Sequence, residues 1–305
     1  MIINSKRPQN LQDNVHWQHP EAIVECNWLK DQIGNRSVRI YDCTTYLHYT
    51  DDHPSKPYDV GSGLTEYEKS HIPQSAYLDL QNDLSEKDSP YSFTLPHLIA
   101  LADRFKQHGI GDPFHVVLYS RNGMQWATRV WWMIHVSGYQ RVSILNGGFT
   151  EWLRLRLPTE EGRTHFPSAE FKVEAKSEVF IDKERVLKVI NENSSVLLNA
   201  LTEDIHLGEN PRYGRPGRIP NSCNIPFHHL VDSKSGKFIL PKDALQIFKG
   251  KNINPDDEII NYCGGGIAAT LNAFLLYQLG FSHIFIYDNS MSEWAMDPAL
   301  PMETG

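Results

Sequence analysis

The stretch "VVLYSRNGMQWATRVWWMIHVSGYQRVSILNGGFTEW", residues 116–152, has a counterpart in "EIINYCGGGIAATLNAFLLYQLGFSHIFIYDNSMSEW", residues 258–294. The positions that align are Tyr119 with Tyr262, Ser120 with Cys263, Gly138 with Gly280, and Glu151–Trp152 with Glu293–Trp294. Internal repeats decide the architecture of a chain, because each copy is one folding unit. This pair therefore predicts that the same unit occurs twice.

Two further matches lie upstream of this pair. "HIPQSAYLDL", residues 71–80, matches "RIPNSCNIPF", residues 218–227, and "VRIYDC", residues 38–43, matches "VLLNAL", residues 196–201. Along the chain the offset between the copies falls from 158 to 147 and then to 142 or 143. A drift in one direction is what insertions and deletions in loops leave behind, whereas chance similarity scatters the offsets. The sequence is therefore interpreted as an internal duplication.

Each copy has the pattern of an α/β unit. The runs "VVLY", "VSIL", "EIINY" and "HIFIY" are short, apolar and rich in β-branched residues, which is typical of buried strands in a parallel sheet. Between them, residues 126–138 and 268–280 have helical length and end at Gly138 and Gly280, where a left-handed C-cap residue belongs. Such alternation predicts a mainly parallel sheet with helices on both faces in each domain.

A chain of 305 residues is long enough for two domains. We place the first domain at residues 18–157, a polar linker with two prolines at 158–177, and the second domain at 178–301. Residues 46–70 have the composition of a loop that ends in a short helix, and they predict an insertion over the surface of the first domain.

Composition and charge exclude several classes of partner. The formal net charge of −8 opposes non-specific binding to nucleic acid or to an anionic membrane, because both need a basic face. No apolar run reaches membrane-spanning length, and residues 1–10 do not resemble a signal peptide, so we expect a cytoplasmic protein. The four cysteines are widely spaced, which indicates neither a disulfide framework nor a metal site, and no cofactor is expected.

Cys263 stands between a predicted strand and a predicted helix, directly before three glycines. Backbone N–H groups in a tight glycine loop at a helix N-terminus converge on one spot and favour an anion there, so a thiolate is favoured at this position. Residues without a Cβ allow that close convergence. The loop alone leaves a second interpretation open, in which Cys263 is a small buried apolar residue and the glycines only permit a turn.

The first copy carries Ser120 at the position of Cys263, so the fold does not require sulfur there. No base stands beside Ser120 in the sequence. We therefore expect one active loop in the chain, with the first copy shaping the cleft without taking part in catalysis.

Taken together, these motifs resemble the tandem rhodanese-domain sulfurtransferases, the thiosulfate and 3-mercaptopyruvate sulfurtransferases. The resemblance rests on "HIPQSAYLDL", "RVWWM" and "LNGGFTEW" in the first copy, and on "GRIPNSCNIPF", "YCGGGIAAT" and "DNSMSEW" in the second. It implies that Cys263 accepts a sulfane sulfur from a small anionic donor as a persulfide. It also implies that Gly264, Gly265, Gly266, Ile267 and Ala268 form the loop that cradles the persulfide charge.

The resemblance further implies an acceptor that is a thiol or cyanide, with a thiol carrier protein as one alternative. An anionic donor calls for a cation near the loop, and "RYGRPGRIP" supplies Arg215 as the first candidate, followed by Arg212 and Arg218. His71 matches a first-copy histidine that lies near the domain interface in the mercaptopyruvate branch. For these four residues the alternatives are solvated arginines and a structural histidine.

The loop departs from both branches of the family. It has neither the charged side chains of thiosulfate-type loops nor the Gly-Ser-Gly of mercaptopyruvate-type loops, so the donor stays open between the two. Arg218 replaces the usual histidine before Ile-Pro, and Asn199 replaces an aspartate. A phosphatase would need an arginine where Ala269 stands. The remaining alternative is a persulfide carrier or an interaction scaffold without turnover.

Overall fold

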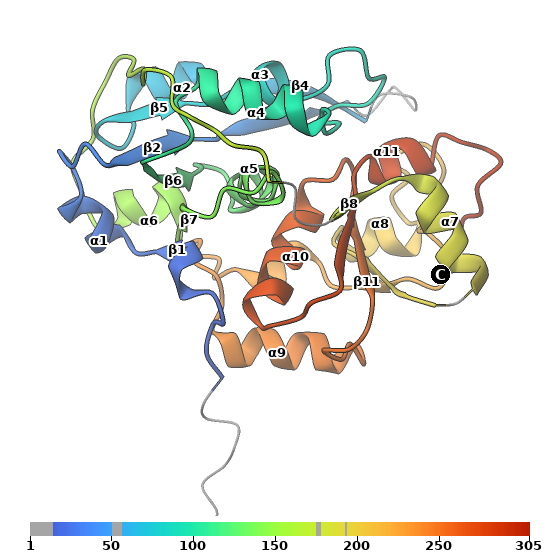
Figure 1. The fold of residues 1–305 in the computed structure, drawn as a ribbon. Helices are drawn as coiled ribbons and strands as arrows, with labels where there is room; N and C mark the ends of the chain where they lie inside the picture. Colours follow the sequence, from blue (N-terminus) through green and yellow to red (C-terminus); the bar gives the residue numbers. More distant parts are fainter. Residues whose placement is uncertain (1–14, 51–56, 175–177, 193) are drawn as a thin grey trace, which may run out of the picture.

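The computed structural model describes residues 15–50, 57–174, 178–192 and 194–305. The fold is α/β and consists of two parallel-sheet units, shown in Figure 1. The first sheet has the order β1 (Ile23–Val24), β7 (Val142–Leu145), β6 (His115–Tyr119), β2 (Val38–Asp42) and β5 (Ser75–Tyr77). The second has the order β8 (Phe180–Ile181), β12 (Ile284–Tyr287), β11 (Ile259–Tyr262), β9 (Val196–Asn199) and β10 (Cys223–Asn224).

The two sheets have the same strand order when the strands are matched by the sequence repeat. Every pairing within each sheet is parallel. The buried contacts repeat as well: the Tyr119 hydroxyl lies 2.9 Å from the Ser75 hydroxyl, and the Tyr262 hydroxyl lies 2.7 Å from the Ser222 hydroxyl. The duplication inferred from the drifting offset is therefore also a duplication of structure.

Helices cover both faces of the first sheet. Val117 and Tyr119 pack in one apolar cluster with residues of α1 (Cys26–Asp31) and α6 (Gly148–Arg154). Their neighbours Val116 and Leu118 point to the other face, where they join the main core with α4 and α5. The remaining helices of this domain are α2 (Leu64–Lys69), α3 (Leu80–Leu84), α4 (Leu98–Gln107) and α5 (Gln125–Val136).

The helices of the second domain are α7 (Lys183–Glu192), α8 (Glu203–Leu207), α9 (Pro241–Gly250), α10 (Ala268–Gln278) and α11 (Ser290–Trp294). Two short 3-10 helices, η2 (Pro20–Ala22) and η3 (Phe227–Leu230), complete the helical part of the described chain. Within that part, no helix has the length and apolar character that a membrane crossing requires.

The two domains meet through α5 and α10, which lie side by side near the centre of Figure 1. Both helices are apolar nearly all round, as expected of helices that are buried on every side. The Trp132 indole donates a hydrogen bond to the Thr270 carbonyl over 3.1 Å, and the Thr128 and Thr270 hydroxyls lie 2.8 Å apart. This contact brings the N-terminal ends of α5 and α10, and the loops that precede them, to the domain interface.

Residues 46–70 contain more regular structure than their composition indicates. An antiparallel hairpin forms between β3 (Thr45–Tyr49) and β4 (Tyr58–Ser62), and α2 follows it. The prediction of a loop before the short helix is therefore wrong for the two strands. Cross-strand pairing between Tyr49 and Tyr58 fixes the register of this hairpin, and composition alone does not reveal such a partner.

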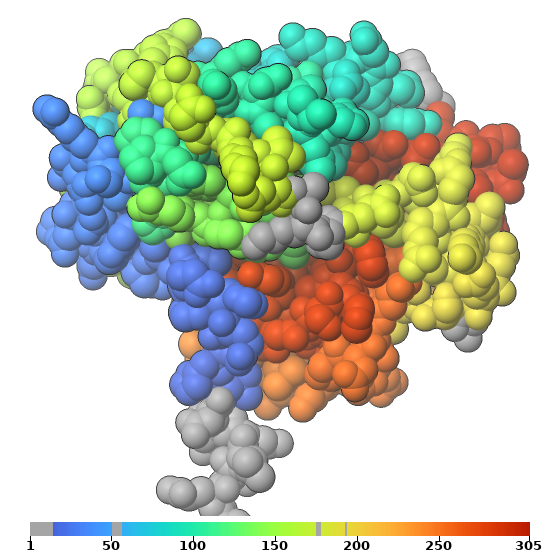
Figure 2. Space-filling model, viewed as in Figure 1, coloured from blue at the N-terminus to red at the C-terminus, as the bar shows by residue number. Residues whose placement is uncertain are grey.

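Backbone hydrogen bonds tie the segment after α6 to the first domain. Glu160 exchanges two of them with His71 over 2.9 Å, and the Glu170 carbonyl accepts one from the Asp112 N–H over 2.8 Å. The N-terminal end of the first domain contacts the second domain, because the Gln18 N–H donates to the Gln278 carbonyl of α10 over 2.7 Å. Figure 2 shows this N-terminal segment, in blue, against the orange and red surface of the second domain.

Candidate active site

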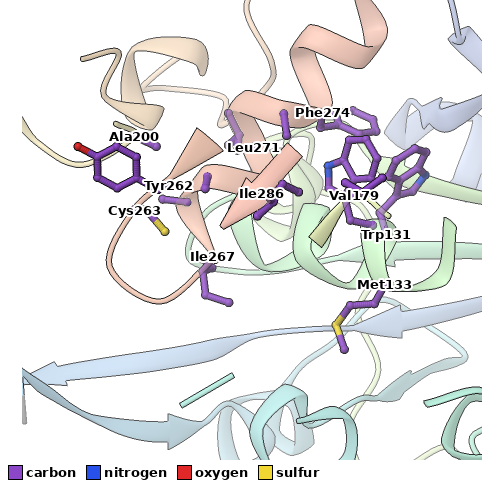
Figure 3. Packing of buried hydrophobic residues seen from close by; sticks show 14 of the residues in the cluster. Trp131, Met133, Val179, Ala200, Tyr262, Cys263, Ile267, Leu271, Phe274 and Ile286 are labelled. Atoms are coloured by element: carbon purple, nitrogen blue, oxygen red, sulfur yellow. The ribbon is translucent and has the colours of Figure 1, made fainter. Parts of the chain in front are cut away.

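Cys263 follows β11 directly and begins the loop that leads into α10. Its side chain is buried, with 2% of its surface exposed. The Cys263 N–H donates to the Ser290 hydroxyl over 3.0 Å, and the Cys263 carbonyl accepts from the Met291 N–H over 3.0 Å. In Figure 3 the sulfur lies on the concave side of the loop, which ends near Ile267. The start of α11 therefore fixes the backbone of Cys263 from outside the loop.

Two carbonyl groups of the glycine stretch have partners, whereas its three N–H groups have none among the described residues. The Gly264 carbonyl accepts from the Ser292 N–H over 2.7 Å, and the Gly266 carbonyl accepts from the Arg129 guanidinium over 3.1 Å. Within the described chain, the N–H groups of Gly264, Gly265 and Gly266 donate to no protein acceptor. Buried N–H groups without a partner are rare, and a set of them in one loop forms a site for an anion.

A cavity of about 80 Å³ opens at Cys263 and is walled by both domains. Its aromatic walls are Tyr49, Tyr58, Phe93 and Trp126 from the first domain, and Tyr213 and Phe227 from the second. Its fourteen lining residues, all from the described ranges, include no aspartate, glutamate, lysine, arginine or histidine. An apolar cavity with a few convergent polar groups is typical of a small-molecule site.

Each of the three glycines is required for a separate reason. A Cβ on Gly264 would overlap the hydroxyl of Tyr213, and a Cβ on Gly265 would lie 2.7 Å from the hydroxyl of Tyr58. Gly266 has a φ of +70°, and a Cβ there would overlap a backbone carbonyl of the loop before α11. Tyr213 and Tyr58 thus occupy the space that side chains at positions 264 and 265 would need.

Arg129 reaches the loop from α5 of the first domain and is fully buried. Besides the Gly266 carbonyl, its guanidinium binds the Phe93 carbonyl over 2.6 Å and the Asp288 carboxylate over 2.7 Å. Sequence analysis did not select this residue. A signal was present, because an arginine within the apolar run "RVWWM" must be buried and must therefore have partners.

Arg215, the first candidate for donor binding, does not line the cavity. Its guanidinium donates to four backbone carbonyls at distances of 2.6 to 2.9 Å. These belong to Trp294, Ala295, Asp297 and Leu300. Arg215 therefore fastens the chain after α11, and its donors are already occupied.

Arg218 and His71 occupy matching positions in the two copies, and neither lines the cavity. Arg218 is buried, donates to the Gly305 carbonyl over 2.7 Å, and forms an ion pair with Glu303. His71 is also buried, and its Nδ1 contacts the Tyr67 carbonyl over 2.8 Å. In each copy this residue pairs through its backbone with the segment that follows the domain: His71 pairs with Glu160, and Arg218 pairs with Glu303.

Arg212 is the predicted arginine that lies beside the cavity. Its guanidinium carbon is 4.0 Å from the centre of the Tyr49 ring, which belongs to the cavity wall. In the described ranges the guanidinium forms no hydrogen bond and no ion pair within 4 Å. Its donors are thus available to an anion at the mouth of the cavity.

The loop of the first copy that begins at Ser120 contains an internal hydrogen bond. The Ser120 hydroxyl donates to the Gly123 carbonyl, three residues further along the same loop. Arg121 packs over the Phe149 ring at 4.0 Å and lies 3.4 Å from the buried carboxylate of Asp42. In the part of the chain that the structure describes, the Ser120 hydroxyl makes no hydrogen bond to a histidine or carboxylate side chain that could act as a base.

The presence of asparagine rather than aspartate at position 199 is explained by the side chain that Asn199 contacts, which is His206. In the first copy Asp42 faces a guanidinium, whereas the amide nitrogen of Asn199 lies 3.1 Å from Nδ1 of His206. Burial, with a smaller contribution from the nearby Arg218 guanidinium, lowers the pKa of His206 to about 4. His206 is therefore uncharged at neutral pH, and a neutral amide pairs with it without leaving a buried carboxylate unbalanced.

No cluster of three or more histidine, cysteine, aspartate or glutamate side chains in the described residues could hold a metal ion. The four cysteines are all free thiols in the structure.

The sequence matches the family model for the rhodanese-like domain over residues 25–155 and 188–297. It is 31% identical over 287 residues to 3-mercaptopyruvate sulfurtransferase of Mus musculus, covering 90% of this chain and 92% of that protein. It is 29% identical to thiosulfate sulfurtransferase of Cricetulus griseus, covering 92% and 94%. The crystal structure of SseA, a 3-mercaptopyruvate sulfotransferase from Escherichia coli, superposes with a TM-score of 0.73 at 27% identity, covering 88% of this chain and 98% of that one.

Proposed function

Because the chain belongs to the rhodanese family and is a sulfurtransferase, we propose that it transfers sulfur from 3-mercaptopyruvate to a thiol or cyanide acceptor through a persulfide on Cys263. The observation that carries the persulfide is the loop around Cys263, in which three glycine N–H groups have no acceptor among the residues that the structure describes. Such groups stabilise negative charge on the outer sulfur without adding a positive side chain.

The chemistry proceeds in two balanced steps. The Cys263 thiolate attacks the sulfur of the donor, and the donor C–S bond breaks with its electron pair left on carbon. That carbon takes the proton of the donor thiol, so that pyruvate leaves and an anionic persulfide stays on Cys263. An acceptor thiol then attacks the outer sulfur, which leaves with the acceptor as a persulfide while Cys263 returns as thiolate.

The donor assignment rests on the absence of charge among the lining residues, all of which lie in the described chain. Thiosulfate carries its charged oxygens on the atom next to the transferred sulfur, so they would have to enter the apolar cavity at a high desolvation cost. In 3-mercaptopyruvate two carbons separate the carboxylate from the sulfur. The uncharged thiol end can enter while the carboxylate stays at the mouth, where Arg212 provides the positive charge.

We assign the chemistry to residues 178–301 and a supporting role to residues 18–157. The first domain contributes Arg129 and Tyr58 to the loop and the cavity, while its own Ser120 is hydrogen-bonded within its loop. The acceptor is a thiol or cyanide, and a thiol carrier protein is one form that it can take.

The test is sulfur loading of the protein by each donor. The protein is incubated with 3-mercaptopyruvate or thiosulfate, and intact mass is measured before and after addition of cyanide or dithiothreitol. We expect a gain of one sulfur atom that is faster with 3-mercaptopyruvate, disappears with the acceptor, and is absent in Cys263→Ala. Loading without repeated turnover would instead indicate a persulfide carrier, and no loading from either donor would contradict the proposal.

A further inference from the structure

We infer that the hydroxyl groups of Tyr213 and Tyr58 donate hydrogen bonds to the transferred sulfur on Cys263. They would supply the side-chain hydrogen bonds that the glycines of the loop cannot make. This inference rests on the proposed function and deepens it. It assigns catalytic roles to one residue from each domain, neither of which belongs to the loop.

Tyr213 lies directly after Arg212, and only 5% of its surface is exposed. Its hydroxyl and the adjoining edge of its ring occupy the place that a side chain on Gly264 would take. The hydroxyl makes no hydrogen bond to another group of the described ranges. Because Tyr213 also lines the cavity, its O–H has a donor left for a ligand bound there.

Tyr58 is the first residue of β4, in the first domain, and it also lines the cavity. It too is 5% exposed, and its hydroxyl lies 2.7 Å from the position of a Cβ on Gly265. Its ring packs against Phe93 with 6.3 Å between the ring centres, and edge-on against Tyr49 at 6.2 Å. The two hydroxyls therefore lie against consecutive residues of the loop, in positions fixed by packing.

Both phenols keep their protons at physiological pH. Burial raises the pKa of Tyr58 to about 12, and it raises the pKa of Tyr213 as well. For Tyr58 a hydrogen bond with the Ser292 hydroxyl opposes this rise, and for Tyr213 the Arg212 guanidinium opposes it, but burial is the larger effect for both. A protonated phenol is a hydrogen-bond donor, so the two groups suit a sulfur that gains negative charge.

In the proposed reaction the two tyrosine hydroxyls act only as hydrogen-bond donors and transfer no proton. When the donor C–S bond breaks, negative charge remains on the outer sulfur of the persulfide, and the two O–H groups donate to it without giving up their protons. Neutral donors suit this cavity, because a lysine or arginine on the loop would itself have to be desolvated there. The consecutive glycines then have a purpose beyond flexibility: any side chain at Gly264 or Gly265 would displace these hydroxyls.

The test removes each hydroxyl and leaves the ring. Tyr213→Phe, Tyr58→Phe and the double variant are mixed with 3-mercaptopyruvate, and persulfide formation on Cys263 is followed in a single turnover by quenched intact mass. We expect the maximal loading rate to fall about 10- to 100-fold for each single variant, with a smaller change in the donor concentration at half-maximal rate. The matched control is Tyr277→Phe, which removes a hydroxyl from α10 outside the cavity.

A second measurement separates a role in chemistry from a role in packing. The unloaded thiol is alkylated with iodoacetamide, and the thermal midpoint of each variant is recorded. If alkylation and loading fall by the same factor, the hydroxyls only hold the loop in place and the inference fails. It also fails if the phenylalanine variants load within twofold of the wild type. If the wild type itself does not load, the proposed function fails instead, so the two failures are distinguishable.

Discussion

The Arg129 guanidinium of the first domain lies 3.1 Å from the carbonyl oxygen of Gly266, in the loop of the second domain that begins at Cys263. The same guanidinium pairs with Asp288, which precedes α11. A single buried cation thus joins α5 of the first copy to both segments that position Cys263 in the second copy.

Replacement of Arg129 by methionine should destabilise the protein and slow sulfur loading together. The substitution leaves the Asp288 carboxylate without its cation and the Gly266 carbonyl without its donor. Breaking a buried pair in this way costs about 3–5 kcal/mol in the free energy of unfolding, which denaturant titration measures. Arg141→Met, at an exposed arginine, is the control and should change little. Equal stability of the two variants would contradict this account of the interface.

Arg212→Gln should weaken donor binding and leave the fold intact. The guanidinium lies against the Tyr49 ring at the cavity and has no other hydrogen-bonding partner in the described ranges. Loss of a charge-assisted hydrogen bond to the donor carboxylate should raise KM for 3-mercaptopyruvate about 10- to 100-fold. Steady-state kinetics with cyanide as acceptor measures the effect. A normal KM in this variant would exclude Arg212 from donor binding.

Arg215→Gln should give the opposite result. Four backbone carbonyls after the start of α11 lose their donor, so we expect the free energy of unfolding to fall by about 3 kcal/mol. The KM for the donor should stay near the wild-type value in the folded fraction. Thermal melts and kinetics on the same preparations compare the two arginines, and a large KM effect for Arg215→Gln with an unchanged melting temperature would reverse our assignment.

Gly264→Ala should abolish most of the loading activity. The added Cβ overlaps the Tyr213 hydroxyl, so either the ring or the loop must move, and a displacement of about 1 Å costs a catalytic site about 100-fold in rate. Gly250→Ala is a matched control, because it lies at the end of α9 and its Cβ meets no atom within 4 Å. Comparable loading by the two variants would show that the space beside Gly264 is not critical.

His206 should make the stability of the protein depend on pH. Its pKa falls from an ordinary value of 6.5 to about 4, because burial disfavours the charged ring. Between these values the unfolded chain binds more protons than the native chain, so stability is full above pH 6.5 and is lost as the pH falls toward 4. The lowered pKa corresponds to about 3 kcal/mol over this window. Urea titrations across the window should show less of this slope in His206→Gln, and an unchanged slope would contradict the prediction.

The fold could be predicted from the sequence because its main signals are local. The strands β6 and β11 are short apolar runs that are almost wholly buried, and α5 and α10 are each followed, two residues later, by a glycine with positive φ, so short stretches of sequence were sufficient to predict these elements. The duplication needed only a comparison of the chain with itself. By contrast, the β3–β4 hairpin depends on pairing across residues 45–62, and its composition resembles that of a loop.

The position of Cys263 could be predicted, but the groups around it could not. Arg215 and Arg212 are three residues apart and equally polar, yet the partners of Arg215 lie about eighty residues further along the chain. Tyr58 and Arg129 reach the loop from the other domain, and no spacing in the sequence connects them with Cys263. Only the packing of α5 against α10 reveals these neighbours.

The closed loop at Ser120 has a consequence for the history of the gene. A duplicated copy that loses its nucleophile would ordinarily drift or be deleted, because nothing depends on it. Here Arg129 of that copy contacts the loop of the second copy and Tyr58 lines its cavity, so the half that carries Ser120 is constrained by a site that begins in the other half. Mutations that are neutral in a solitary domain become costly in this pair, and each half restricts the changes that the other can accept.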